Sequence, residues 1–260
     1  MLLRFHRNTR YSDFTLPSMA DRYFSQLPIT ASEVVLADNE AHHLAHVLRA
    51  KPGLEVTLFD GGGAEFAARV KEVKRDRVTL DVLARRDISR ESPLRLTLAV
   101  ALPKGDRQKW LVEKLVELGA ARLMPLVTAR AVSQPVAAAL DRLRRGVIEA
   151  SKQCGRNRLM EIAEPRDWQS LLAESDAESP RWFAHPGASA APVALPTTTS
   201  ALICAVGPEG GFTEAEARAA LAAGWTPVEL GPRILRVETA AAALAANLLA
   251  PLAVGPKEAP

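Results

Sequence analysis

Two glycine-rich segments near the carboxyl end carry the residue types that line small-molecule pockets. They are Gly207-Pro208-Glu209-Gly210-Gly211 and Leu230-Gly231-Pro232-Arg233-Ile234-Leu235-Arg236. Each follows an apolar run typical of a strand and precedes an alanine-rich run typical of a helix. Glycine lets the backbone approach a ligand closely, and open α/β sheets bind ligands beyond the carboxyl ends of their strands. We therefore predict one pocket built from both segments, and an enzyme rather than a scaffold.

The first segment lacks the features of a phosphate-binding loop. The sequence has no GxxxxGK[ST] pattern, and Glu209 stands where such a loop has a lysine. A carboxylate there disfavours phosphate but tolerates a cationic or neutral ligand, such as a sulfonium or an adenosine. Thr213 and Glu216 have the spacing of a capping box, so a helix is predicted to begin at Thr213. These residues alone leave an adenosyl pocket and other small-molecule pockets open.

The composition is that of a globular protein of one or two domains. The 260 residues are 48% hydrophobic and 24% charged, and the net charge of +3 permits a nucleic-acid partner without requiring one. Cys154 and Cys204 show no metal-ligand spacing, so no metal site is predicted. Unpatterned cysteines fit a reducing cytosol, and no apolar run is long enough to span a membrane. We expect a cytoplasmic protein without a membrane partner.

The elements that would position these segments differ before and after residue 90. Residues 1–20 show no period and are expected to form a loose tail. Residues 21–90 carry short strand patterns, which predict a small antiparallel β-barrel. Within it, residues 41–49 predict a short helix with Leu44, Val47 and Leu48 on one face. The predicted strands are 33–36, 55–60, 65–70 and 78–83.

Residues 91–255 alternate between strand and helix patterns. Near-continuous apolar strands with helices between them predict an α/β domain, with a parallel sheet covered by helices on both faces. Gly119 is predicted to end the first of these helices. The predicted strands are 94–102, 123–127, 181–184, 201–206 and 228–230, and the predicted helices before the glycine segments are 106–118 and 136–153.

Taken in order, these motifs resemble those of the SPOUT, or α/β-knot, methyltransferases. More narrowly, they resemble the RsmE family of 16S rRNA (uracil-N3)-methyltransferases. The resemblance covers about residues 21–251 and includes both glycine segments. The other motifs that carry it are Val47–Arg49, Phe59–Gly61, Arg90–Pro93, Glu113–Gly119 and Gln153–Arg158.

The resemblance implies a PUA-like RNA-binding β-barrel at 21–90 and a SPOUT domain with a trefoil knot at 91–255. It implies a homodimer that uses S-adenosyl-L-methionine, without a metal, to methylate N3 of uridine 1498 in 16S rRNA of the 30S subunit. Two alternatives stay open. One is a SPOUT enzyme that methylates the ribose 2′-O of transfer RNA, and the other is an rRNA-binding protein without catalytic activity.

The resemblance also implies roles for single residues. Arg236 and Arg233 are catalytic candidates that would contact the uridine or its phosphate, or would instead form a salt bridge with Glu238 or with the partner subunit. Glu209 is a candidate proton acceptor, or a structural group that holds loop amides or an arginine. The cofactor would contact Gly207, Pro208, Glu209, Gly210, Gly211, Leu230, Gly231, Pro232, Ile234 and Leu235. RNA would contact Arg22 and Arg49. Arg156, Asn157 and Arg158 would approach RNA or the mouth of the cofactor site, and the alternative for them is a solvated loop.

Overall fold

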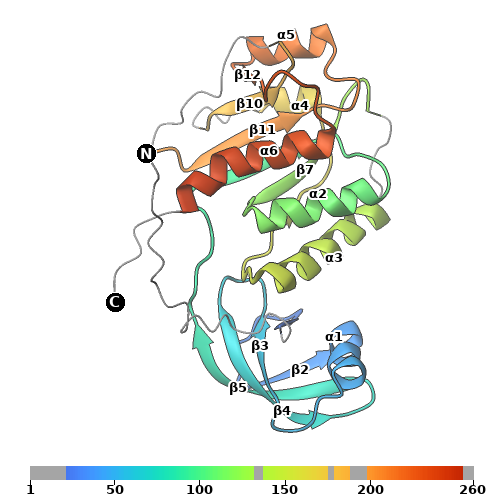
Figure 1. The fold of residues 1–260 in the computed structure, drawn as a ribbon, viewed down its shortest axis with the longest axis vertical. Coiled ribbons are helices and arrows are strands. Elements are labelled where there is room, and N and C mark those ends of the chain that lie inside the picture. Colours follow the sequence, from blue (N-terminus) through green and yellow to red (C-terminus); the bar gives the residue numbers. More distant parts are fainter. Residues whose placement is uncertain (1–21, 132–136, 175–178, 188–197, 254–260) are drawn as a thin grey trace, which may run out of the picture.

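The computed structural model describes residues 22–131, 137–174, 179–187 and 198–253. The tail expected at residues 1–20 lies outside these ranges. The described chain forms two parts, a curled sheet below and a larger α/β layer structure above (Figure 1). A connection between strands β5 and β6 joins them.

The lower part is a five-stranded sheet with the order β1-β3-β4-β5-β2. Strand β1 runs parallel to β3, while the other pairs are antiparallel. The sheet is therefore mixed rather than wholly antiparallel as predicted, because the sequence pattern gave no sign of the short β1. The four strands that the sequence predicted are all present. The strands are β1 (Arg22–Phe24), β2 (Glu33–Ala37), β3 (Glu55–Phe59), β4 (Glu65–Val73) and β5 (Arg77–Arg86).

The helix predicted at 41–49 is α1 (Asp38–His42) followed by a π-helical turn, η2 (His43–Val47). Leu44 is fully buried, but Val47 is 60% exposed and Leu48 is 39% exposed. The three residues therefore do not form one buried face. The amide of Leu48 donates to the carbonyl of His43, and this wider turn rotates the later side chains out of the α-helical register.

The upper part is a parallel sheet with the order β12-β10-β11-β6-β7-β8, and β9 pairs with β7 beside this path. The predicted strands and helices of this part are present, except that the last strand lies at 226–228 instead of 228–230 and residue 136 of the second helix lies outside the described residues. The elements β8, β9 and α4 were missed because they are short. The strands are β6 (Arg95–Val100), β7 (Arg122–Val127), β8 (Glu161–Ile162), β9 (Arg166–Asp167), β10 (Arg181–Ala184), β11 (Ala201–Val206) and β12 (Thr226–Val228). The helices are α2 (Asp106–Glu117), α3 (Ala137–Cys154), α4 (Trp168–Ala173), α5 (Glu214–Ala222) and α6 (Val237–Leu249), followed by the 3-10 turn η3 (Ala250–Ala253).

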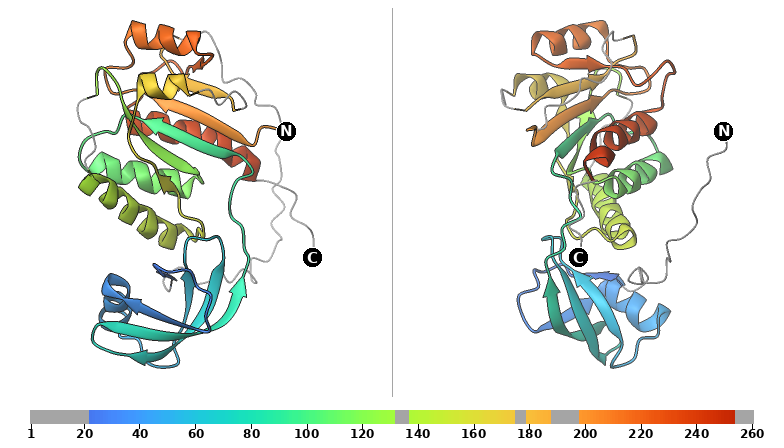
Figure 2. Two further views of the ribbon diagram at one scale, coloured as in Figure 1. Left: turned by 180° about the vertical axis from the view of Figure 1, so that it is seen from behind. Right: turned by 60° about the vertical axis from the view of Figure 1, so that its left-hand side comes forward.

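Helices cover both faces of this sheet, as predicted. Successive strand residues point to opposite faces, and in β11 Cys204 packs under α2, α3 and α6 while Ala205 packs under α4 and α5. The side view shows the two helical layers on either side of the strands (Figure 2). The trefoil knot implied by the resemblance stays a prediction, because strand order alone does not test threading.

Strand order also fixes where the glycine segments lie. Strand β10 pairs in parallel with both β11 and β12, so the carboxyl ends of β11 and β12 lie at the same edge. The first segment follows β11 and the second follows β12. The capping box of Thr213 and Glu216 begins α5 as predicted. No helix within the described ranges is both long and apolar enough to span a membrane.

Candidate active site

The two glycine segments line one cavity of about 390 Å³ at the carboxyl edge of the upper sheet. Every residue predicted to contact the cofactor lines this cavity, and Arg233 does so too. Its size falls in the range of small-molecule sites. The prediction missed the contribution of the segment after β10, which supplies a third wall. The lining residues that were missed include Ala184, His185, Pro186, Phe212, Glu229 and Val237.

Glycine is required at two positions of the first segment for different reasons. A Cβ atom at Gly207 would lie 3.1 Å from the ring carbons Cδ2 and Cε2 of Phe212. That ring cannot yield easily, because it stacks on the buried Trp168 with centroids 4.7 Å apart. Gly211 has φ +66°, a conformation that L side chains rarely adopt. The loop therefore folds tightly over Phe212 and exposes its backbone to the cavity.

A second loop, which follows β7, holds the first glycine segment in place. One carboxylate oxygen of Glu216 accepts from the Ala129 amide at 2.8 Å, and the other accepts from the Thr213 amide at 2.8 Å. Arg130 donates to the carbonyl of Gly210 at 2.5 Å. Burial raises the pKa of Glu216, but the hydrogen bonds from Ala129 and Thr213 outweigh it and leave the pKa below its ordinary value. The ionised carboxylate thus joins this loop to the start of α5.

Glu209 lies at the mouth of the cavity and pairs with an arginine that the sequence did not single out. Its Oε1 atom is 3.1 Å from Nη1 of Arg107, and the same nitrogen is 3.7 Å from Oε2 of Glu238. Of the roles weighed for Glu209, holding an arginine fits this geometry. The residues around Arg107 in the sequence did not indicate this pairing, because its acidic partners, Glu209 and Glu238, lie more than 100 positions along the chain. A role of Glu209 as proton acceptor stays a prediction.

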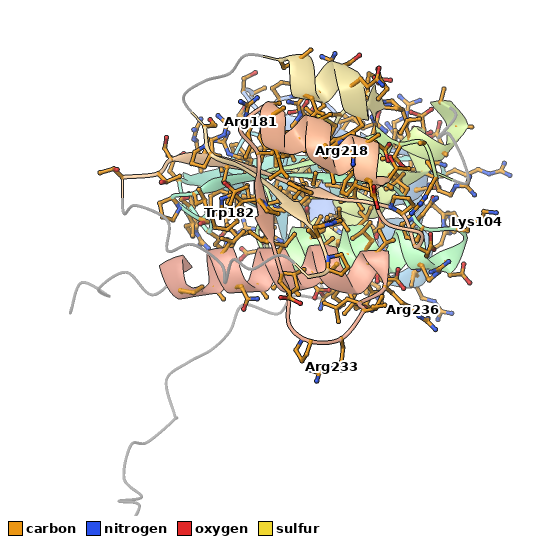
Figure 3. All side chains as sticks on the ribbon, turned by 90° about the horizontal axis from the view of Figure 1, so that it is seen from above. Lys104, Arg181, Trp182, Arg218, Arg233 and Arg236 are labelled. Carbon is orange, nitrogen blue, oxygen red and sulfur yellow. The ribbon has the colours of Figure 1, made fainter. Side chains whose placement is uncertain are left out.

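Arg233 and Arg236 are both exposed on the segment that joins β12 to α6. In the described part of the chain neither guanidinium forms an ion pair or a hydrogen bond. The alternative of a salt bridge with Glu238 is therefore wrong, since Glu238 faces Arg107 instead. Figure 3 shows Arg233 at the outer bend of this segment and Arg236 near the start of α6. Arg236, unlike Arg233, does not line the cavity.

Three of the predicted RNA contacts are buried between the two parts of the molecule. Arg22 donates to Glu65 at 3.0 Å and to Oδ1 of Asn157 at 2.6 Å. Arg156 forms a two-hydrogen-bond pair with Glu91 at 2.8 and 2.6 Å. The solvated-loop alternative is wrong for Arg156 and Asn157, which are only 4% and 3% exposed. Arg22, Arg156 and Asn157 use their polar groups within the protein, because buried charges need paired partners.

The other two predicted RNA contacts remain open to solvent. Arg49 is exposed just after the π-helical turn and has φ 51°. Arg158 is exposed and lines a second cavity of about 300 Å³ at the junction of the two parts. Arg85 and Ser89 line the same cavity. The role of both residues in RNA binding stays a prediction. Among the described residues, no group of three or more His, Cys, Asp or Glu side chains could hold a metal ion.

Comparison with known proteins agrees with this arrangement. Residues 90–249 match an RNA methyltransferase domain family, and residues 36–83 match an RNA methyltransferase PUA domain family. The chain is 34% identical to the ribosomal RNA small subunit methyltransferase E of a Synechocystis strain over 224 residues, which cover 82% of this chain and 71% of that protein. It is 31% identical to the Bacillus subtilis protein of the same name over 236 residues, which cover 84% of this chain and 92% of that protein.

Solved structures agree as well. A ribosomal RNA small subunit methyltransferase E from Neisseria gonorrhoeae, bound to S-adenosyl methionine, has a TM-score of 0.82 at 32% identity and covers 88% of this chain and 96% of its own. A putative methyltransferase from Legionella pneumophila, in complex with the same cofactor, has a TM-score of 0.83 at 32% identity and covers 89% and 97%. The chain therefore belongs to the RsmE family of ribosomal RNA small subunit methyltransferases.

Proposed function

We propose that this protein transfers the methyl group of S-adenosyl-L-methionine to N3 of uridine 1498 in 16S rRNA. Family membership supports the coarser statement, methylation of small-subunit ribosomal RNA. The single observation that carries the proposal is the cavity at the carboxyl edge, because both glycine segments of the family pattern line it. The choice of N3 and of this uridine rests on the family resemblance.

The residues around the cavity fit the cofactor. Glycine backbone at 207 and 231 gives polar ligand groups access to amides and carbonyls, while Leu230 and Leu235 offer apolar walls to an adenine ring. When bound, the cofactor supplies an activated methyl group on a sulfonium. These segments would hold it, and Glu229 and Leu235 line the same space.

The chain itself must favour loss of the uridine N3 proton and hold the base in line with the methyl group. A fixed positive charge stabilises a developing anion, and Arg236, at the start of α6, has no ion-pair partner among the described residues. The amino end of α6 adds a partial positive charge on the same side. Correct placement of the two reactants supplies much of the remaining rate gain.

The assembly and location of the protein belong to the same proposal. Ile234 is 88% exposed and Trp110, on the neighbouring helix α2, is 41% exposed. Exposed large apolar side chains are commonly covered at protein interfaces. We infer a homodimer that covers them and acts on the 30S subunit or its rRNA in the cytoplasm.

Nucleoside analysis tests the reaction. Mass spectrometry of 16S rRNA from a deletion strain should show the loss of one 3-methyluridine, and the wild-type gene should restore it. Unchanged 16S rRNA together with an altered transfer-RNA ribose would instead support the alternative SPOUT activity. Calorimetry with S-adenosyl-L-methionine tests the non-catalytic alternative, because a protein that binds RNA alone should give no heat.

A further inference from the structure

We propose that Arg107 is a positioning residue that ties the two walls of the cavity together by bridging Glu209 and Glu238. This inference rests on the proposed function, since it assigns Arg107 a part in holding the methyl donor. Arg107 lies in the first turn of α2 and does not itself line the cavity. Its effect must therefore pass through the two carboxylates.

The guanidinium of Arg107 lies between two elements that are distant from each other in the sequence. Glu209 belongs to the segment after β11, which forms one wall of the cavity. Glu238 belongs to the first turn of α6, where its neighbour Val237 lines the opposite wall. Nη1 of Arg107 is 3.1 Å from the former carboxylate and 3.7 Å from the latter. In the described residues, no other lysine or arginine pairs with either one.

Burial makes the contact with Glu238 matter more than an ordinary surface pair. The Glu238 side chain is only 8% exposed, and its Oε2 atom has no hydrogen-bond partner among the described groups. A buried carboxylate without a cation is costly, and the amino end of α6 offsets only part of that cost. Arg107 is the group that keeps this carboxylate inside the protein. Without it, the start of α6 must shift so that Glu238 can reach water.

The shift would change the cavity itself. Val237 and Ala240, on either side of Glu238 in the same helix, both line the cavity. A movement of the first turn of α6 therefore displaces the wall that contains Val237. The loss of the pair between Arg107 and Glu209 also leaves the first glycine segment, the other wall, less firmly held. We expect weaker binding of the cofactor rather than a direct loss of the chemical step.

The test compares Arg107→Ala with the double variant Arg107→Ala/Glu238→Gln. Lys109→Ala is the matched control, because Lys109 lies on the same helix and its pair with Glu113 is exposed. Calorimetry gives the affinity for S-adenosyl-L-methionine, thermal unfolding of the ligand-free protein gives the stability, and kinetics separate KM from kcat. Arg107→Lys serves as the conservative variant.

Arg107→Ala should weaken cofactor affinity about tenfold, equivalent to 1.4 kcal/mol, and raise KM for the cofactor more than it lowers kcat. Glu238→Gln should restore much of the affinity and of the melting temperature, because the amide removes the uncompensated charge. Arg107→Lys should keep part of the affinity, and Lys109→Ala should match the wild type. Cofactor affinity within twofold of wild type in Arg107→Ala, or no recovery in the double variant, overturns the inference. Absence of heat with the wild-type protein would instead count against the proposed function.

Discussion

The guanidinium of Arg22 donates to the side-chain oxygen of Asn157 at 2.6 Å, although the two residues are 135 positions apart. The same guanidinium pairs with Glu65, which also accepts from Arg90 at 3.2 Å. Arg22 and Glu65 belong to the lower sheet, whereas Asn157 follows α3 in the upper part. This buried network joins the two parts of the molecule by charge and hydrogen bonds.

Glu65→Gln should destabilise the protein by about 3 kcal/mol, because it leaves the buried Arg22 without its counter-ion. Urea unfolding followed by circular dichroism measures the loss. Glu55→Gln is the control, since the Glu55–Arg69 pair is exposed and should contribute less than about 1 kcal/mol. Equal losses in the two variants would contradict a special role of the buried pair.

The same network should make stability depend on pH. Burial raises the pKa of Glu65, but hydrogen bonds and charges from Arg22 and Arg90 outweigh it and hold the pKa below its ordinary value of 4.5. A carboxyl whose folded pKa is lowered stabilises the fold above its ordinary pKa and loses that contribution as the pH falls through the folded pKa. The difference in unfolding free energy between wild type and Glu65→Gln should therefore be constant near neutral pH and shrink below pH 4.5. If the difference in unfolding free energy between the two proteins stays unchanged below pH 4.5, the Glu65 carboxylate does not stabilise the fold in this way.

Gly207→Ala should damage the cavity more than Gly210→Ala, although both changes lie in one loop. A Cβ atom at Gly207 meets the buried ring of Phe212, whereas one at Gly210 meets the flexible Cδ of Arg130 at 3.3 Å. We expect at least a tenfold loss of cofactor affinity for the first variant, on the order of 1.4 kcal/mol or more, and a much smaller loss for the second. Calorimetry measures both, and a larger loss for Gly210→Ala would refute the steric argument.

Local patterns were enough to predict much of the fold. The capping box at Thr213, the helix end at Gly119 and the cavity-lining glycines each follow from residues that lie close together in the sequence. Such features depend on local backbone conformation, which short segments largely determine.

The missing parts depend on partners that are distant in sequence. Arg22 and Arg156 were read as surface cations because charged residues are seldom buried unless they are paired, and nothing nearby revealed Glu65 or Glu91 as their partners. The pairing of Arg107 with Glu209 and Glu238 was not predicted for the same reason. The exposure of Val47 has another cause, since the π-helical turn changes the residue period on which the prediction relied.

Arg236→Ala should reduce methyl transfer far more than cofactor affinity. Arg236 is exposed, unpaired and outside the set of cavity-lining residues, so its removal leaves the cavity walls in place. If its charge stabilises the uridine anion, kcat should fall by about 100-fold or more, the size seen when one stabilising donor is lost. Single-turnover methylation of 16S rRNA and calorimetry with the cofactor give the two quantities.

Arg233→Ala is the natural comparison for that experiment. Arg233 is also exposed and unpaired, but it lines the cavity from the outer bend of the segment. A change there can alter cofactor affinity as well as rate, whereas Arg236→Ala should alter rate almost alone. Arg236→Lys should recover part of the rate, because it keeps the positive charge near the start of α6. Equal losses of rate and affinity in Arg236→Ala would mean that the residue shapes the cofactor site instead of acting on the uridine.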